Sequence, residues 1–246
     1  MPLGETRAPT PEELARIYQL RFGSMVDFRA RMWRILTGRF FTNFVRPGDA
    51  VLDLGCGYGE FINTIECARK YAMDLNAGAQ HYLDESVTFM HQDCSTPWPL
   101  PAAGLDVVFS SNFLEHLPSK VHVDATLDQA RRSLKPGGRL ILMGPNIRFL
   151  AERYWDFWDH YIPISHVSLS EALRNRGFDI ERVWPRFLPY TMAGRGRSSI
   201  SASFFELCLK TYLALPVVWP LFGRQFLVIA TPRSSVLPTP QSHSSD

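Results

Sequence analysis

The sequence predicts an α/β fold in which a mostly parallel sheet carries helices on both faces. Short apolar runs alternate with helix-like segments from residue 50 onward, and this order is typical of strand–helix–strand units. Glycine-rich turns mark two of the junctions, after the first apolar run and before the fifth. With 246 residues, of which 46% are hydrophobic, the chain can bury the core of one such domain.

Residues 1–45 are expected to form an N-terminal helical lid. Thr10–Glu13 places Pro at the first helical position and acids in the first turn. Leu14–Phe44 then carries apolar and arginine side chains at helical spacing. Because Tyr18 and Arg21 fall on one face of this helix, the pattern predicts either a lid over a ligand or a plain docking face.

Strands and helices alternate after the turn Arg46–Asp49. The predicted strands are Ala50–Leu54, Tyr71–Met73, Val87–Met90, Leu105–Ser110 and Arg139–Met143. The predicted helices between them are Glu60–Arg69, Ala77–Asp84 and Val121–Leu134. The turn Lys135–Gly138 ends the last of these helices and leads into the fifth strand.

The last third of the chain adds one helix, two strands and two insertions. The helix is predicted over Ser168–Arg176, with a Ser N-cap and Glu171 at the capping-box position. The two strands, which bring the sheet to seven, are Phe178–Val183 and Gln225–Ala230. The remaining segments are an aromatic-rich, substrate-covering insertion over residues 145–167, an apolar insertion over residues 191–222, and a disordered tail over residues 232–246.

The apolar insertion is open to several interpretations. A helix is predicted over Phe204–Leu215, and Pro216 and Pro220 prevent it from continuing through the apolar run. The segment 204–222 can serve as a dimer surface, a pocket wall for a greasy substrate, or a peripheral contact with a membrane surface. Core packing or a subunit interface is the favoured interpretation, with a homodimer as the matching assembly.

Composition argues against several classes of protein. A formal net charge of +2 supplies no basic field for nucleic acid. The N-terminus lacks the apolar core of a signal peptide, and no run reaches the ~18 apolar residues of a membrane span. No CxxC spacing occurs among the cysteines, so we expect reduced thiols in a cytoplasmic protein; they are Cys56, Cys67, Cys94 and Cys208.

The strongest functional signal is V-L-D-L-G-C-G-Y-G-E-F, residues 51–61. Its glycines follow a buried strand and open a helix, which is where α/β folds bind cofactors. A dinucleotide fingerprint needs a small residue where Glu60 stands, and a carboxylate there disfavours a pyrophosphate. The buried acid Asp53, inside the strand, also favours a cation. The turn therefore predicts a cationic cofactor that carries no phosphate.

L-D-L-G-C-G-Y-G resembles motif I of the class I S-adenosylmethionine (SAM)-dependent methyltransferases. Further stretches follow in that family's order: A-M-D-L-N, H-Q-D-C, L-D-V-V-F-S-S-N-F-L-E-H-L and L-K-P-G-G-R-L-I-L-M-G-P-N. The resemblance covers about residues 46–185. It implies a Rossmann-like sheet whose last strand is antiparallel, a SAM-binding domain over residues 46–231, and SAM as the cofactor.

The resemblance also implies the residues that bind SAM. Asp74, at the end of the second strand, would hold the ribose hydroxyls, although it could instead cap the next helix. Asp93 would meet the adenine amino group, although it could be a turn acid. The whole implied set is Asp53, Gly55, Cys56, Gly57, Gly59, Asp74, Leu75, Asp93, Cys94, Ser110 and Asn112, with Tyr18 and Arg21 from the N-terminal helix.

Three histidines are candidate catalytic residues: His116, His160 and His166. Histidine is the side chain most easily poised near neutral pH, and a base is needed when the nucleophile must lose a proton. Asp159 is expected to orient a neighbouring imidazole of the pair His160 and His166. The pair Glu115-His116 resembles one in ubiquinone-biosynthesis O-methyltransferases, where the loop is associated with a divalent metal. The carboxylate one helical turn earlier in those enzymes is Asn112 here, so we predict no metal.

The sequence therefore predicts an enzyme that transfers a methyl group from SAM to an oxygen, nitrogen or carbon atom of a small molecule. Two other functions remain as alternatives. One is a SAM-binding partner protein that catalyses nothing. The other, which Glu60 disfavours, is a nicotinamide-dependent oxidoreductase.

Overall fold

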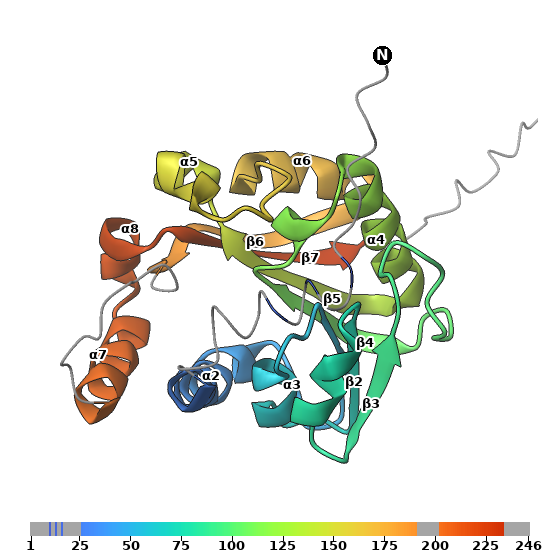
Figure 1. The fold of residues 1–246 in the computed structure, drawn as a ribbon, viewed down its shortest axis with the longest axis horizontal. Coiled ribbons are helices and arrows are strands. Elements are labelled where there is room, and N and C mark those ends of the chain that lie inside the picture. The colour runs from blue at the N-terminus through green and yellow to red at the C-terminus, as the bar shows by residue number, and fades with distance from the viewer. Residues whose placement is uncertain (1–9, 11–12, 14–15, 17–25, 191–201, 234–246) are drawn as a thin grey trace, which may run out of the picture.

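Seven strands form one sheet through the middle of the molecule (Figure 1). The computed structural model describes residues 26–190 and 202–233, together with Thr10, Glu13 and Arg16. In those residues the strand order is β3-β2-β1-β4-β5-β7-β6. The strands are β1 (Ala50–Leu54), β2 (Arg69–Asp74), β3 (Val87–His91), β4 (Leu105–Ser111), β5 (Leu134–Pro145), β6 (Phe178–Leu188) and β7 (Gln225–Pro232).

The sheet is parallel except at β7, as predicted. β1 pairs in parallel with both β2 and β4, and β4 pairs in parallel with β5. β7 is antiparallel to both β5 and β6. All five residues of β1 are buried, because helices cover both faces of the sheet. This double coverage explains why the strand is almost continuously apolar, and why Asp53 is conspicuous within it.

Helices cover the two faces as separate layers (Figure 1). On one face, apolar residues of α4 and α6 pack against the sheet in one core cluster. On the other face, residues of α2, α3, α7 and α8 belong to a second cluster. The helices are α2 (Val26–Arg39), α3 (Glu60–Thr64), α4 (Lys120–Ser133), α5 (Ile147–Leu150), α6 (His166–Asn175), α7 (Ala202–Ala214) and α8 (Trp219–Phe222).

Several predicted helix boundaries were wrong. The helix after the glycine turn ends at Thr64, five residues early, and the predicted helix at 77–84 is a 3-10 helix over Ala77–Tyr82. The N-cap of α6 is Ser165, whose side chain accepts from the backbone N–H of Ser168. The hydroxyl of Ser168 in turn accepts from the backbone N–H of Ser165, so this pair forms the capping box that was predicted for Glu171.

The chain termini differ from expectation where the structure describes them. The predicted helix over 14–44 includes α2 but breaks at Phe40, after which Phe41–Asn43 forms a 3-10 turn. Tyr18 and Arg21 lie outside the described residues. β7 continues to Pro232, and Arg233 still donates to the carboxylate of Asp179, so the chain remains structured past the predicted start of the tail at 232. Residues 234–246 lie outside the described part of the chain.

Candidate functional site

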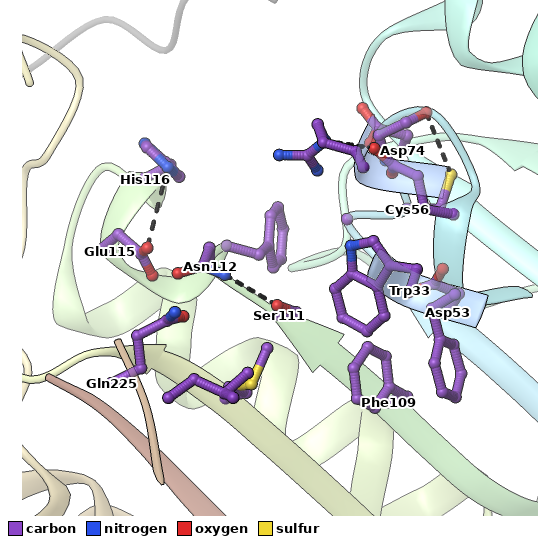
Figure 2. A pocket seen from close by; sticks show the side chains of 18 of the residues that line it. Trp33, Asp53, Cys56, Asp74, Phe109, Ser111, Asn112, Glu115, His116 and Gln225 are labelled. Atoms are coloured by element: carbon purple, nitrogen blue, oxygen red, sulfur yellow. Dashed lines mark hydrogen bonds and ion pairs between the residues drawn. The ribbon is translucent and has the colours of Figure 1, made fainter. Parts of the chain in front are cut away.

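A cavity of about 470 Å³ lies where β1, β2 and β4 reach their carboxyl ends. Its walls come from α2, the glycine turn, the loop after β4, the segment around residues 157–160, and α7. Figure 2 shows the glycine-turn side and the β4-loop side facing one another across this space. A site at the carboxyl edge of a doubly covered sheet is the usual place for a ligand in such folds.

The glycine turn has a backbone that only glycine adopts easily. Gly55 and Gly57 have φ values of 68° and 54°, in the left-handed region. A Cβ atom on Gly55 would lie 2.3 Å from the ring of Phe113, so the loop after β4 packs directly on the turn. Gly59, at φ 71°, is the N-cap of α3 and does not line the cavity. Gly59 can therefore contribute to cofactor binding only by shaping the turn, and not by lining the cavity.

Asp74 connects the glycine turn to β2. Its Oδ2 accepts from the backbone N–H of Gly57 at 2.9 Å, and its Oδ1 accepts from that of Asn76 at 2.8 Å. A carboxylate has about four lone-pair sites, so each oxygen can still accept from a hydroxyl of a ligand. Burial raises the pKa of Asp74, although these backbone hydrogen bonds act in the opposite direction. The N-cap of the following 3-10 helix is Asn76 and not Asp74, while Asp74 lines the cavity, where ribose binding stays a prediction.

Asp53 is the second buried acid on this side. Its side chain lies within β1 and lines the cavity, and burial together with the charge of Glu60 raises its pKa well above the ordinary value. A cationic ligand beside Asp53 and Asp74 would favour their charged forms. The arrangement fits the ammonium and sulfonium groups and the ribose hydroxyls of SAM.

Glu60 does not act as the sequence argument assumed. The guanidinium of Arg29, from α2, forms a hydrogen-bonded ion pair with its carboxylate, and both residues line the cavity. The carboxylate is therefore largely neutralised, and its charge alone cannot exclude a phosphate. No sequence pattern indicates this contact, because it joins residues 31 positions apart.

The other predicted cofactor residues divide into two groups. Asp93 lines the cavity while its Oδ1 accepts from the backbone N–H and the hydroxyl of Ser95, so it is also the turn acid. Ser110 does not line the cavity; its hydroxyl donates to the carbonyl of Leu54 and fastens β4 to β1. The remaining predicted residues that line the cavity are Cys56, Leu75, Cys94 and Asn112.

The loop after β4 presents His116 and Glu115 to the opposite side of the cavity (Figure 2). His116 Nδ1 lies 2.8 Å from the backbone carbonyl oxygen of Asp159 and 3.2 Å from its carboxylate oxygen Oδ2. Since a carbonyl oxygen only accepts, Nδ1 carries the proton. In the neutral ring Nε2 is therefore the unprotonated nitrogen, and it lies 4.0 Å from Oε1 of Glu115.

The electrostatics of this group favour a bound proton. Burial lowers the pKa of His116, but the bond with Asp159 and the charge of Glu115 outweigh it, so the pKa is raised. Glu115 is almost fully buried, and burial raises its pKa to about 7. A proton that reaches Nε2 of His116 is thus stabilised by two carboxyl groups.

The three candidate histidines are not equivalent. The ring of His160 is buried, lines the cavity, and lies with its centroid 4.9 Å from that of His116. His166 does not line the cavity; it is the first residue of α6, and its Nδ1 is hydrogen-bonded to the side-chain amide of Asn146. Asp159 contacts His116, a histidine for which the sequence did not predict this role.

Sequence reasoning missed a polar residue on the same side of the cavity as the β4 loop. Gln225, the first residue of β7, lines the cavity. Among the described residues, Oε1 of Gln225, Oδ1 of Asn112 and Oε1 of Glu115 are buried without a hydrogen-bond partner. Figure 2 shows these three side chains gathered on the same side of the cavity as His116. Three unsatisfied acceptors in one place indicate a ligand that donates hydrogen bonds.

Much of the remaining cavity lining is aromatic. Side chains from six separate segments contribute rings, and the sequence alone does not indicate that these rings come together. They include Trp33, Phe61, Phe109, Phe113, Phe157, Tyr190, Phe205 and Tyr212. Phe61 and Phe109 stack with their centroids 3.7 Å apart, which fixes part of this surface.

One group of side chains in the described part of the chain is also arranged as metal ligands could be. Ligand atoms of Glu115, His116 and His160 all lie within 4.8 Å of one another. The same spacing suits groups that share a proton. The absence of a metal therefore stays a prediction.

Comparison of the sequence with known proteins indicates the family to which this chain belongs. A family model described as a methyltransferase domain matches residues 25–183. The 27-O-demethylrifamycin SV methyltransferase of Amycolatopsis mediterranei (strain S699) is 36% identical over 110 residues, 40% of this chain and 39% of that protein. A relative from Encephalitozoon cuniculi (strain GB-M1) is 30% identical over 121 residues, 46% of this chain and 53% of that protein. The chain thus spans about half or less of these curated relatives.

Solved structures show the same fold. A SAM-dependent methyltransferase from Archaeoglobus fulgidus superimposes with a TM-score of 0.61 at 21% identity, over 89% of this chain and 99% of that one. A chain from the complex of the Haloferax volcanii Trm112 methyltransferase activator with a methyltransferase gives a TM-score of 0.65 at 19% identity, over 92% and 98%. The family model covers more than half of the chain, and the superposed methyltransferase structures share its fold. The chain therefore belongs to the class I SAM-dependent methyltransferases, with SAM as its cofactor.

Proposed function

We propose that this protein methylates a hydroxyl oxygen of a small molecule, with His116 as the general base. The observation that carries the proposal is the hydrogen bond from His116 Nδ1 to the backbone carbonyl of Asp159, which leaves Nε2 as the basic nitrogen. A general base is useful only when the nucleophile carries a proton that must leave, as a hydroxyl does.

Bound SAM supplies an electrophilic methyl group on a sulfonium sulfur. The residues that would hold it are Asp53, Asp74 and Asp93, with the backbone of the glycine turn. The chain's part in the reaction is then to align the acceptor and to remove its proton, and alignment alone supplies much of the rate. His116 Nε2 takes the proton from the acceptor hydroxyl, and the carboxylates of Asp159 and Glu115 stabilise the imidazolium that results.

The walls of the cavity support a hydroxylated acceptor with an apolar body. Trp33, Phe109 and Phe157 offer ring surface, and the unsatisfied oxygens of Asn112, Glu115 and Gln225 accept from hydroxyl groups. The A. mediterranei relative is, by its name, a methyltransferase of 27-O-demethylrifamycin SV, which indicates an oxygen as the methyl acceptor. The similarity covers less than half of either chain, so it supports the acceptor class and not that particular substrate.

The test is a panel of acceptors measured by formation of S-adenosylhomocysteine. The panel contains phenols and apolar alcohols, each matched with an amine of the same skeleton. We expect turnover of hydroxyl acceptors, retained after chelation of divalent cations. In His116→Gln we expect kcat to fall about 10²–10⁴-fold with unchanged binding of S-adenosylhomocysteine, while the exposed control His81→Gln behaves as wild type.

Three results would contradict the proposal. Turnover confined to the amines would assign a different nucleophile. Loss of activity on chelation, restored by a divalent cation, would make Glu115, His116 and His160 metal ligands instead of a proton-accepting group. Tight SAM binding without turnover of any acceptor would favour the SAM-binding partner protein.

A further inference from the structure

The outer face of α7 and α8 exposes an unusual number of large apolar side chains. We define the apolar face as six residues that are each 47–79% exposed: Phe204, Leu207, Leu215, Val217, Leu221 and Phe222. Soluble surfaces usually carry such residues singly, and six of them within 19 residues of the chain indicate a contact with another apolar phase. Figure 1 shows these two helices projecting at one side of the molecule, away from α4.

The helices that carry this face form a bent pair. No single helix in the described part of the chain is long and apolar enough to cross a membrane. The segments Ser203–Ala214 and Pro216–Phe222 satisfy the length and hydropathy criteria only together, and they meet at an angle of 94°. Pro216 follows the end of α7 and prevents one straight helix. This shape suits a segment that lies on an apolar phase better than one that spans it.

Charges around the apolar face point to the nature of its partner. Glu206 is the acid of the described part of the insertion, and its carboxylate lies 3.8 Å from both Lys210 and Arg31. At the tip, the guanidiniums of Arg186 and Arg224 donate to the carbonyl oxygens of Leu221 and Gly223. Two fixed cations therefore stand beside exposed Leu221 and Phe222, a combination that suits anionic phospholipid headgroups above an acyl phase.

The apolar face is also continuous with the catalytic cavity. Phe222 is 60% exposed and at the same time lines the cavity, as do Phe205, Leu209 and Tyr212 on the other side of α7. The same two helices thus separate the cavity from the outside and carry apolar groups on both sides.

We propose that the apolar face of α7 and α8 binds to the surface of a lipid bilayer and anchors the enzyme there. The rival occupant of the apolar face is a second copy of the chain. A twofold contact through this face would repeat the same arginines on both sides, and Glu206, the acid of the described part of the insertion, already has cationic partners. A bilayer that contains anionic lipid supplies both the apolar phase and the negative charge.

The experiment is vesicle flotation with the full chain. The vesicles are phosphatidylcholine alone, or phosphatidylcholine with about one third phosphatidylglycerol, because anionic lipid attracts arginines near the surface. We expect flotation with the anionic vesicles, weakened by added salt. The double variant Val217→Asp/Leu221→Asp should partition at least tenfold more weakly, since it removes two large apolar side chains from the contact.

Controls separate the proposal from misfolding and from the proposed activity. Val121→Asp changes a residue that is equally exposed on α4 and should float as wild type does. The double variant should keep its melting temperature and its affinity for S-adenosylhomocysteine in solution, because neither residue lines the cavity. Equal flotation of wild type and double variant would overturn the proposal. Failure of the wild type to float would also overturn it. In that case, a concentration-dependent dimer that the wild type forms and the double variant does not would assign the apolar face to a second copy of the chain.

Discussion

Asp159→Asn tests how the carboxylate of Asp159 supports the proposed base. The substitution keeps the backbone carbonyl that accepts from His116 Nδ1, so the tautomer is retained while the charge is lost. A hydrogen bond to a charged group is worth about 1.5–3 kcal/mol, and the imidazolium that forms during proton removal would lose that support. This corresponds to a fall in kcat of about 10–100-fold.

The pH profile gives the same variant a second, independent measurement. Asp159 raises the pKa of His116, so its removal should lower that pKa. A base must be unprotonated to act, and wild-type kcat/KM should therefore fall as the pH drops below the pKa of His116. In Asp159→Asn this acid limb should move to lower pH.

The assay is formation of S-adenosylhomocysteine against pH, with the best hydroxyl acceptor of the panel. Asp156→Asn is the matched control, because Asp156 is exposed in the same segment and does not line the cavity. An unchanged acid limb in Asp159→Asn would refute the reasoning, because His116 would then not be the group that titrates. A limb that moves to higher pH would refute it as well.

Three further predictions follow from single residues. Asp74→Ala should weaken binding of S-adenosylhomocysteine by about 10-fold or more in calorimetry, whereas Glu85→Ala, which lies outside the cavity, should not. Gly55→Ala should lower the free energy of unfolding by about 2–4 kcal/mol in urea, from left-handed strain and the clash with Phe113; Gly48→Ala, with open space around it, is the control. Burial raises the pKa of Glu115 from 4.5 to about 7, so the folded state holds its proton longer than the unfolded state does. Wild type should therefore lose up to about 3 kcal/mol relative to Glu115→Gln as the pH rises from 4.5 through 7; a difference in melting temperature that does not change with pH would contradict this.

The sequence predicted well those elements whose signal is local. β1 was located to the residue, because a strand buried on both faces must be apolar throughout, and the glycines after it mark its end. Asp74 and Asp93, which the family resemblance implied for SAM binding, both line the cavity, since Asp74 ends β2 and Asp93 closely follows β3. Boundaries failed where a competing cap decided the outcome, as when Ser165 and Ser168 formed the capping box and started α6 two residues early.

The acceptor side of the site could not be predicted in this way. Asp159 contacts His116, which lies 43 residues earlier, because the chain folds back over the β4 loop. The backbone carbonyl of Glu115 accepts from Tyr161 and Ile162 and holds that segment in place. Gln225 begins an apolar strand, and nothing in its neighbourhood marks it as a cavity residue. These contacts depend on tertiary structure, for which the sequence offers residue types but no geometry.

The ion pair between Arg29 and Glu60 changes where cofactor selectivity resides. The sequence argument assigned the exclusion of phosphates to Glu60, but Arg29 offsets that charge. The acids that face the cavity from within the sheet are Asp53 and Asp74, and burial raises the pKa of both. A cation restores their charge at little cost, whereas a pyrophosphate beside them would hold them protonated or repel them. We therefore expect the preference for a cationic cofactor to be set by β1 and β2, the strands that carry these two acids, while α2 adds a wall to the cavity without deciding which cofactor it admits.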